Sequence, residues 1–552
     1  MKKIFLNLLF LSSFNLVAQW STNSAINTPM SSAPKSQGNS HSVSDSKGGV
    51  ITSWDDNRNS TTNSSDIYAQ RIDKSGIIKW ALNGIVVCSN IATQKSSAII
   101  ASNNGSAIIT WEDNRNGNYD IYAQKIDSAG NILWTSDGIP VCSKSTNQKN
   151  PKLVSDNAGG AIVVWEDSLN FYWDIYAQRI SSTGAQLWNS NGISICSAPN
   201  AQGNPKIDID GLGGAIITWQ DKRNNVDYDI YAQRINNSGT VLWTANGVVV
   251  CNSVNTQNNP RIEPDGSNGA LIAWVDKRNA IDNDIYAQHI NSSGAIQWTS
   301  NGVAVCTASN NQSALDIKYI GAAGLILSWK DERSGANAIY SQIVTMSGTP
   351  QLTSNGVLIS TGLKSINPNT IIDGNGGAII AWQDSTSVGW DIKSQKINST
   401  GTIAWASGGA TVSDAFDDQI NVSHVTDNNG GAIFVWEDHR NGTNYDLYAN
   451  HLFDNGTFFV GLNELYNHSL QAVCYPNPIN HNSIIKISNN QSHEPWEITI
   501  YDSYGKKIAT TVLKANESYA LNSDDYSSGI YFYSIRLTSS LNYSKGSFIS
   551  IK

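Results

Sequence analysis

The sequence carries a recurring loop in which an aspartate is followed two residues later by an arginine and, a few residues further on, by a second aspartate. An Asp beside an Arg in a tight turn predicts a charge-assisted, bidentate ion pair that locks a hairpin and caps its turn. The loops that we assign to this structural repeat contain Asp113, Arg115 and Asp120; Asp221, Arg223 and Asp229; Asp276, Arg278 and Asp284; and Asp438, Arg440 and Asp446.

These loops offer a second chemistry, calcium binding through carboxylate and carbonyl oxygens. An EF-hand places Asp or Asn where the loop places the cation Arg115, so the calcium signal is weak. No Cys-x-x-Cys pair or His-rich spacing indicates zinc. We therefore predict no metal and no cofactor, with calcium as the open alternative.

Two copies of the loop lack the Arg and carry aromatic residues instead, reading SLNFYWD and STSVGWD. Exposed aromatic rings can stack on sugar rings or anchor a protein partner. The competing interpretation is that the tryptophans only replace tyrosines such as Tyr119 as covers of the hairpin. The candidate ligand-binding residues, for carbohydrate or protein, are Phe171, Tyr172, Trp173 and Trp390.

Catalytic residues are not indicated by any motif. A hydrolytic site breaks repeat symmetry, because its nucleophile or acid–base pair occurs once and is tuned by its surroundings. The 8 His residues share no repeat position and no triad-like arrangement. An enzyme that uses a single Asp or Glu in a central channel is still compatible with the sequence, so the catalytic residues are unknown.

The segments that must position these residues recur along the sequence as repeats. A Trp-x-Asp motif recurs at spacings of 53 to 57 residues. Around each motif lie four short segments rich in β-branched and aromatic residues, separated by Gly, Asn and Asp turns, which predict a four-stranded antiparallel meander. We number the repeats 1 to 8 by their motif tryptophans, which are Trp54, Trp111, Trp165, Trp219, Trp274, Trp329, Trp382 and Trp436.

Such units predict an all-β fold, an eight-bladed β-propeller, with an open solenoid as the competing architecture. Repeat 8 lacks its last segment after Asn455, and the segment from Trp20 to Asn27 aligns with the equivalent segment from Trp243 of repeat 4. We therefore expect the N-terminal strand, with Trp20 in it, to close the ring as the outermost strand of the last blade. Cysteines at one equivalent position of five repeats are expected to be small buried hydrophobes and not disulfides; they are Cys88, Cys142, Cys196, Cys251 and Cys306.

Charge and targeting signals limit the partners. The net charge of −9 and the pI of about 5.4 provide no cationic surface for nucleic acid or anionic membranes. Lys2 and Lys3 precede an apolar run that ends at Val17, which predicts a signal peptide at 1–18 and Sec-dependent export. No later segment has the apolar length of a transmembrane segment.

The repeat ends near Leu470, and short alternating strands beyond it predict a small Ig-like β-sandwich. Tyr475-Pro476-Asn477-Pro478 opens this segment, and Lys545-Gly546 precedes its last strand. These motifs resemble the type A C-terminal sorting domain of the type IX secretion system of Bacteroidota. The resemblance implies that residues 472–552 are recognised by the type IX secretion machinery and that the protein is secreted or attached to the outer surface; a generic Ig-like binding module is the alternative.

The expected organisation is thus a signal peptide at 1–18, a propeller at 19–465 and a sorting domain at 466–552. The expected function is an exported module that binds carbohydrate or protein. The alternative is an extracellular polysaccharide-degrading enzyme, a hydrolase or lyase, on the same scaffold.

Overall fold

The structure is a computed structural model that describes residues 20–60, 64–168, 172–458, 472–487, 495–502, 506–514, 517–537 and 543–551. The predicted signal peptide lies outside these residues. The chain divides into two compact units, Met1–Phe459 and Val460–Lys552, which we call the repeat unit and the C-terminal unit. Among the described residues, no helix is long and apolar enough to cross a membrane.

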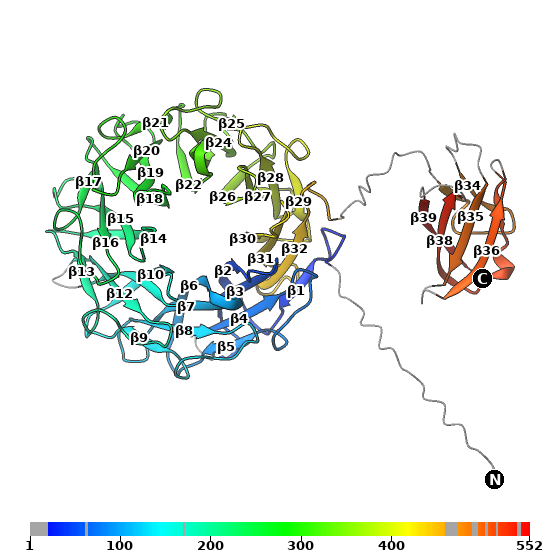
Figure 1. The fold of residues 1–552 in the computed structure, drawn as a ribbon, viewed down its shortest axis with the longest axis horizontal. Helices are drawn as coiled ribbons and strands as arrows, with labels where there is room; N and C mark the ends of the chain where they lie inside the picture. Colours follow the sequence, from blue (N-terminus) through cyan, green and yellow to red (C-terminus); the bar gives the residue numbers. More distant parts are fainter. Residues whose placement is uncertain are drawn as a thin grey trace, which may run out of the picture. The chain divides into compact units, whose positions relative to one another are not determined.

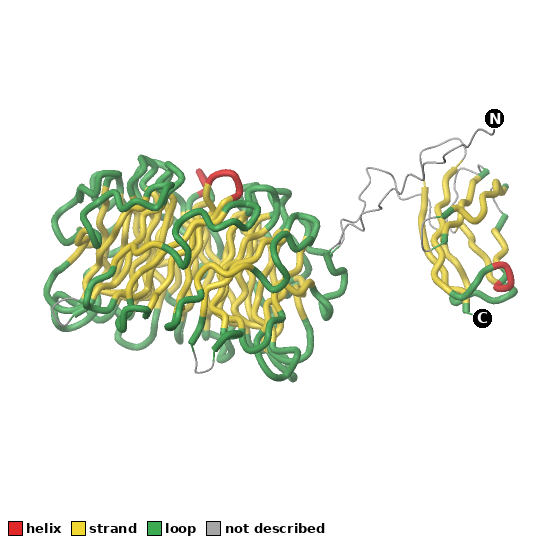
Figure 2. The backbone as a smooth tube through the Cα atoms, turned by 90° about the horizontal axis from the view of Figure 1, so that it is seen from below, coloured by secondary structure: helices red, strands yellow, loops and turns green. Residues whose placement is uncertain are grey.

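The repeat unit is all-β, and its described strands form eight four-stranded antiparallel sheets. Figure 1 shows the sheets following one another around a ring, and Figure 2 shows the same unit from the side with loops on both faces. The sheets of repeats 1 to 4 contain β2 (Gln37–Ser44), β3 (Val50–Asp56), β4 (Asp66–Ile72) and β5 (Ile85–Cys88); β6 (Gln94–Ser102), β7 (Ser106–Asp113), β8 (Asp120–Ile126) and β9 (Ile139–Cys142); β10 (Gln148–Ser155), β11 (Ala161–Asp167), β12 (Asp174–Ile180) and β13 (Ile193–Cys196); and β14 (Gln202–Ile209), β15 (Ala215–Asp221), β16 (Asp229–Ile235) and β17 (Val248–Cys251).

The other repeats follow the same order, from the inner strand to the outer one. Their strands are β18 (Gln257–Pro264), β19 (Ala270–Asp276), β20 (Asp284–Ile290) and β21 (Val303–Cys306); β22 (Gln312–Tyr319), β23 (Leu325–Asp331), β24 (Ala338–Val344) and β25 (Val357–Leu358); β26 (Ser365–Ile372), β27 (Ala378–Ser385), β28 (Trp390–Ile397) and β29 (Ala410–Ser413); and β30 (Gln419–Thr426), β31 (Ala432–Asp438) and β32 (Asp446–Leu452), to which β1 (Thr28–Ser31) is added. Two short 3₁₀ turns, η1 (Asn103–Gly105) and η3 (Gly321–Ala323), interrupt the β structure.

The second strand of each repeat is buried on both faces, as its sequence predicts. Every residue of β11 is buried, because this strand lies between two partners in its own sheet and also packs against neighbouring sheets. The five repeat cysteines are buried and free. Burial raises the pKa of each of these thiols to about 12, so they behave as inert core side chains.

The outermost strand differs from the sequence prediction. In repeat 4 it is β17, whereas Trp243 lies in the preceding connection. Asn246 and Gly247, with φ of 62° and 88°, form the turn between them. The tryptophan reaches the next repeat, where its indole N–H donates to the carbonyl of Ser292 at 3.1 Å. Trp243 therefore packs between repeats, and the prediction that this segment, like its equivalent from Trp20, places the tryptophan in the outermost strand is wrong.

The middle residue of the Trp-x-Asp motif also joins neighbouring sheets. Each inner strand contains a β-bulge, at which Asn150 of β10 has a φ of 56°. Its backbone N–H donates to Glu112 of repeat 2 at 2.9 Å. Equivalent bonds run from Ser96 to Asp55, from Asn204 to Glu166, from Asn259 to Gln220 and from Asn421 to Gln383. In the first repeat the N–H of Ser40, one residue after the bulge residue Asn39, donates to Glu437.

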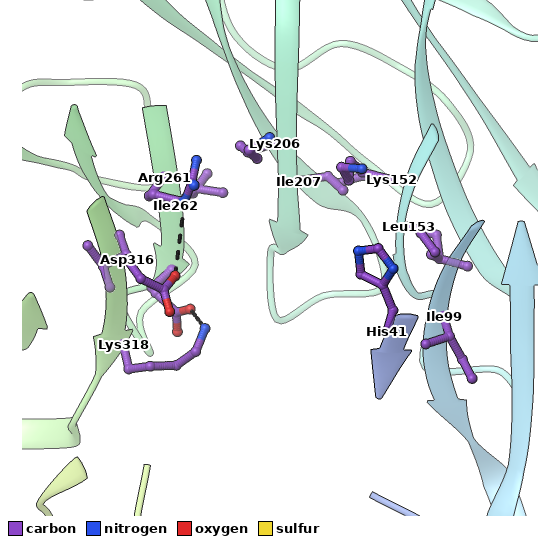
Figure 3. A pocket seen from close by; sticks show the side chains of 13 residues that line it. His41, Ile99, Lys152, Leu153, Lys206, Ile207, Arg261, Ile262, Asp316 and Lys318 are labelled. Atoms are coloured by element: carbon purple, nitrogen blue, oxygen red, sulfur yellow. Dashed lines mark hydrogen bonds and ion pairs between the residues drawn. The ribbon is translucent and has the colours of Figure 1, made fainter. Parts of the chain in front are cut away.

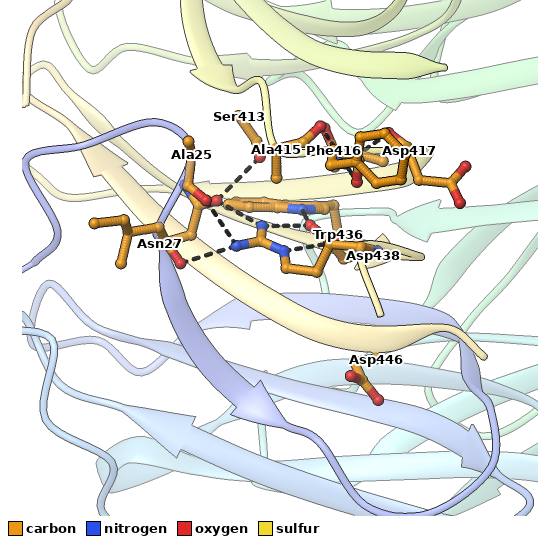
Figure 4. A network of polar contacts seen from close by, with 12 residues as sticks. Ala25, Asn27, Ser413, Ala415, Phe416, Asp417, Trp436, Asp438 and Asp446 are labelled. Atoms are coloured by element: carbon orange, nitrogen blue, oxygen red, sulfur yellow. Dashed lines mark hydrogen bonds and ion pairs between the residues drawn. The ribbon is translucent and has the colours of Figure 1, made fainter. Parts of the chain in front are cut away.

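The N-terminal segment adds a strand to the last sheet, as predicted, but that strand is β1 (Thr28–Ser31), which begins after the predicted segment from Trp20 to Asn27 and does not contain Trp20. β1 pairs antiparallel with β32, and the inner strands β30 and β2 lie in contact. Trp20 is buried, and its indole donates to the carbonyl of Lys74 in repeat 1 at 2.9 Å. Figure 4 shows Asn27 at this junction, where its side-chain oxygen accepts from Nη2 of Arg440 at 2.7 Å and from Ser413 at 3.0 Å.

The C-terminal unit contains two antiparallel sheets. One is formed by β33 (Ala472–Tyr475), β34 (Ser483–Ile487) and β37 (Tyr519–Leu521), and the other by β36 (Lys507–Leu513), β35 (Trp496–Tyr501), β38 (Gly529–Leu537) and β39 (Tyr543–Ser550). A short η4 turn spans Ser523–Asp525. Ile485 and Leu521 from the first sheet and Trp496 and Phe548 from the second share one core, which is the arrangement of a small sandwich.

Candidate functional site

The Asp–Arg loops have the geometry of a structural lock. In repeat 2, Asp113 accepts the indole N–H of Trp111 at 2.8 Å and pairs with Nε and Nη2 of Arg115 at 2.8 and 2.6 Å. Arg115 also lies 3.9 Å above the ring centroid of Tyr122. The spacing of Trp-x-Asp is thus explained, because the tryptophan donates to the carboxylate two residues later. The same ion pair joins Asp221 to Arg223 and Asp276 to Arg278 at 2.6 Å, and Asp438 to Arg440 at 2.5 Å.

The second aspartate of each loop is held by asparagine and not by arginine. Asp120 accepts from the amide of Asn116 at 2.6 Å, and Asn224, Asn279 and Asn441 hold Asp229, Asp284 and Asp446 in the same way. Desolvation by burial raises the pKa of Asp229 and Asp284 to about 6. Within the described residues, no group of three or more His, Cys, Asp and Glu is arranged to hold a metal ion. Calcium binding stays the open alternative to the prediction that the protein holds no metal.

The candidate aromatic residues do not form one site. Phe171 lies outside the described residues, Tyr172 is exposed, and Trp173 and Trp390 are half-buried. Figure 1 shows their strands, β12 and β28, on opposite sides of the ring. The carbonyl of Trp173 accepts the N–H of Gln202 at 2.7 Å, as the carbonyls of Tyr119 and Tyr228 accept from the next repeats. Trp173 therefore occupies the repeat position of those tyrosines.

The absence of Arg from repeats 3 and 7 changes the lock. In repeat 3, Lys144 and Thr146 bind Asp167 at 3.0 and 2.9 Å. In repeat 7, Lys393 pairs with Asp384 at 2.8 Å. The buried indole N–H groups of Trp165 and Trp382 have no hydrogen-bond partner among the described residues. These repeats are thus the two in which the Trp–Asp–Arg network is broken.

Trp173 lines a surface cavity, which we call the rim pocket. Its volume is about 410 Å³, and Trp173 and Tyr228 from neighbouring repeats lie in its wall. Lys149 lies 3.7 Å above the ring centroid of Trp173. The remaining wall is rich in amides and includes Asn150, Gln202, Asn204, Gln220 and Asn259. Aromatic faces and amide groups together suit a polar ligand that also has an apolar face.

A second cavity, the axial cavity, lies between the inner strands and has a volume of about 250 Å³. Figure 3 shows Lys152, Lys206 and Arg261 on neighbouring strands of its wall. These three residues occupy the same register position of β10, β14 and β18, opposite the residue before the motif tryptophan. The other repeats have His41, Ala98, Asp316, Asn369 and Ser423 at this position. The charges therefore break the repeat symmetry.

Some of these charges are paired within the wall. Lys318 pairs with Glu263, and Nε of Arg261 lies 4.0 Å from Asp316. Asp208 has a pKa raised to about 7, first by desolvation and then by the charge of Glu263. The axial cavity is thus lined by both cations and carboxylates, and Asp208, a carboxyl group that titrates near neutral pH, lies on the same inner strand as Lys206.

The axial residues belong to no recurring motif, so the repeat pattern of the sequence does not reveal them. The signal lies in an aligned comparison of the inner strands, in which Lys152, Lys206, Arg261 and Asp316 stand where other repeats have neutral residues or His41. Charged residues on a strand that faces the axis of a ring are costly to desolvate unless they are paired or used. This departure from the repeat is the cue for a site.

Comparisons with known proteins give one family match. Residues 473–549 match the family model described as "Secretion system C-terminal sorting domain". Among curated proteins, none matches the chain in sequence.

Solved structures resemble this chain only weakly. A puromycin hydrolase is 12% identical with a TM-score of 0.43, and the alignment covers 77% of this chain and 61% of that one. An ulvan lyase from a polysaccharide lyase family is 8% identical with a TM-score of 0.41, covering 78% and 97%. The endo-arabinase from Bacteroides thetaiotaomicron VPI-5482 is 12% identical with a TM-score of 0.29, covering 57% and 96%. At these scores nothing about activity or ligand carries over to this chain. The family match, in contrast, identifies the end of this chain as a sorting domain of the type IX secretion system.

Proposed function

We propose that this protein is an exported carbohydrate-binding protein, built as one eight-bladed propeller that its N-terminal strand closes. The pairing of β1 with β32 and the contact of β30 with β2 support the closed ring. The sorting domain supports export by the type IX machinery to the outer surface or the medium. We further propose that a signal peptide at 1–18 first directs the chain through the Sec pathway.

The observation that carries the carbohydrate proposal is the rim pocket. Sugars bind to proteins through their apolar C–H faces, which stack on aromatic rings, and through hydroxyl groups, which bond to planar amides. Trp173 and Tyr228 supply the rings, and the asparagine side chains between them supply the amides. Lys149 above Trp173 keeps that ring half-buried until a ligand displaces the lysine side chain.

Glycan-array binding of the full chain and of Trp173→Ala tests this proposal. We expect wild-type binding to one glycan class and a loss of at least tenfold for the variant. Tyr119→Ala is the matched control, because Tyr119 occupies the equivalent position of repeat 2 and is not among the residues that line the rim pocket. Trp390→Ala tests the platform on the opposite side of the ring. Equal binding by wild type and Trp173→Ala would contradict the rim pocket as the site, and binding only to protein partners would favour a protein ligand.

The alternative, a polysaccharide-degrading enzyme, has one observation in its favour. Asp208 lies on the inner strand β14, and its pKa of about 7 suits a general acid or base. Glu263 lies close enough to raise that pKa by its charge. Release of reducing or unsaturated sugar ends by the wild type, abolished in Asp208→Asn, would establish the enzyme.

A further inference from the structure

Two lysines of the axial cavity have no ion-pair partner among the described residues, unlike Lys318 and Arg261 of the same wall. Lys206 donates to the amide oxygen of Asn204 at 2.8 Å, and no ion pair joins it to a described residue. Lys152 has neither a hydrogen bond nor an ion pair with any described residue. Both side chains are half-buried in the wall.

Cations elsewhere in the repeats are held by partners. On the third strands, Arg234 pairs with Asp210 at 2.9 Å, and Lys125 donates to the carbonyl of Gly159 at 2.6 Å. Lys396 pairs with Asp373 at 3.2 Å. These residues occupy one repeat position and act as structural clamps. Lys152 and Lys206 have no equivalent clamp, so a structural ion pair does not explain them.

The surrounding charges leave these lysines under mutual repulsion. Desolvation, together with Arg261, lowers the pKa of both lysines, and the charge of Lys152 lowers the pKa of Lys206 further. The nearby carboxylates are already engaged, since Glu263 pairs with Lys318, and Asp316 accepts the N–H of Thr370 at 2.7 Å beside Arg261. Glu112 and Glu166 act on these lysines in the opposite sense, but they form ion pairs with Lys95 and Lys149 and not with Lys152 or Lys206. An added anion would therefore relieve a repulsion that the protein compensates only in part.

We propose that Lys152, Lys206 and Arg261 form an anion-binding site in the axial cavity that takes an oxyanion, a carboxylate or a sulfate ester, on a sugar of the ligand. Arg261 supplies a planar donor fork, which suits both oxyanions, and the lysines supply point charges on two adjacent strands. The cavity of about 250 Å³ has room for roughly eight water molecules at ~30 Å³ each, and so for a small charged group and part of its ring. The inference deepens the carbohydrate-binding proposal, because it assigns the ligand to the acidic saccharides.

Isothermal titration of the full chain tests the site with D-glucuronate, D-glucose 6-sulfate and D-glucose. We expect one or both charged sugars to bind and to weaken as salt rises, and D-glucose to bind at least tenfold more weakly. The stronger of the two charged probes identifies the oxyanion. Binding of D-glucose equal to that of both charged sugars would overturn the proposal.

Lys152→Met and Lys206→Met keep the side-chain length and remove the charge, with Lys277→Met at an exposed loop position as the control. We expect each cavity variant to lose charged-sugar binding at least tenfold and to melt at the same or a higher temperature without ligand, because an unpaired, partly desolvated cation is gone. The charged sugar should raise the melting temperature of wild type and Lys277→Met but not of the cavity variants. Unchanged binding in both cavity variants would overturn the site.

Failure of this site and failure of the rim pocket are distinguishable. Trp173→Ala should leave the binding of a charged monosaccharide unchanged, because Trp173 does not line the axial cavity. It should reduce binding only of longer glycans, which reach the rim. Loss of monosaccharide binding in Trp173→Ala would overturn the assignment of the anion to the axial cavity.

Discussion

At the scale of single residues, each position of the Trp-x-Asp motif has a separate bonding partner. The tryptophan donates to the aspartate, and the aspartate accepts from the arginine of the same loop. The middle residue points to the neighbouring sheet and accepts a backbone N–H from its bulge. Repeats 5 and 6 are exceptions, because Val275 and Lys330 at this middle position have no side-chain acceptor for that N–H. The motif therefore encodes both the hairpin and its attachment to the next sheet.

Asp55 should give the folding free energy a pH dependence. It accepts the N–H of Ser96 at 2.9 Å and the amide of Asn39 at 3.1 Å, and desolvation raises its pKa from 3.8 to about 7. Because the folded-state pKa lies above the unfolded one, the neutral acid stabilises the fold fully below about pH 4. This contribution is lost as the pH rises through about 7.

We expect Asp55→Asn to remove that slope, because repeats 4 and 7 already use the amides Gln220 and Gln383 at this position. Relative to wild type, the variant should gain on the order of 2 kcal/mol between pH 4 and pH 8. Urea unfolding of both proteins across this range measures the difference. Asp55→Ala should be less stable at every pH by about 1–3 kcal/mol, since it leaves the Ser96 N–H without an acceptor. Parallel pH profiles of unfolding free energy for wild type and Asp55→Asn would show that Asp55 does not contribute to the pH dependence of stability.

The candidate site residues fall into two groups, those that recur at the same position of the sequence repeats and those that occur in single repeats. The sequence predicts the Asp–Arg ion pairs because the motif repeats at fixed spacing and its chemistry is local. It cannot predict that Lys152 and Lys206 face one cavity, because their neighbours on the axis lie about one repeat away in the chain. Only the arrangement of the inner strands around the axis (Figure 1) brings them together.

At the scale of elements, alternating apolar residues and turn glycines predict the strands. They do not predict that the tryptophan before each outer strand lies outside that strand. Trp243 has the composition of a strand residue, yet it turns away to cover Gly294 of the next repeat. The turn residues Asn246 and Gly247 separate it from β17. A local pattern shows that a residue is buried and does not show against which sheet it packs.

The close approach of Trp243 to Gly294 gives an element-scale prediction. A Cβ at Gly294, which has a φ of +85°, would lie 2.9 Å from Cγ of Trp243. Gly376 is the matched control, because its φ is +84° and a Cβ there would meet only the Cβ of Ser399 at 3.7 Å. The left-handed backbone at both positions should lower the free energy of unfolding of either alanine variant by about 1–2 kcal/mol. Gly294→Ala should lose about 1–3 kcal/mol more, since the indole must move.

Denaturant unfolding of the two variants measures that difference. The double variant Gly294→Ala with Trp243→Leu should recover part of the stability that Gly294→Ala loses, because the smaller leucine side chain leaves room for the new methyl group. Equal destabilisation by Gly294→Ala and Gly376→Ala would mean that Trp243 does not pack tightly on this turn.

At the scale of the whole molecule, the repeat unit combines a nearly symmetric frame with an asymmetric interior. Ion pairs, cysteines and tryptophans recur around the ring, whereas charge at the axis is concentrated on β10, β14, β18 and β22. The rim pocket opens at the same repeats, and Asn204 lines it while accepting from Lys206 of the axial cavity. One sector of the ring, repeats 3 to 6, therefore carries both candidate sites.

The N-terminal strand should decide whether this ring holds together. A chain that begins at Ser32 lacks β1, which leaves β32 as an open edge, and lacks the buried side chains of Trp20 and Met30. We expect this truncated protein to melt at a lower temperature than the full chain and to self-associate through β32, as measured by scanning calorimetry and size-exclusion chromatography.

A synthetic peptide of residues 20–33 added in excess should restore the melting temperature, because the missing strand pairs through its backbone and Trp20 reaches repeat 1. The same peptide with Trp20→Ala and Met30→Ala should restore less, since a large buried side chain contributes several kcal/mol, about 2–5 each. A truncated protein that stays monomeric and melts with the full chain would mean that the ring is stable without its closing strand.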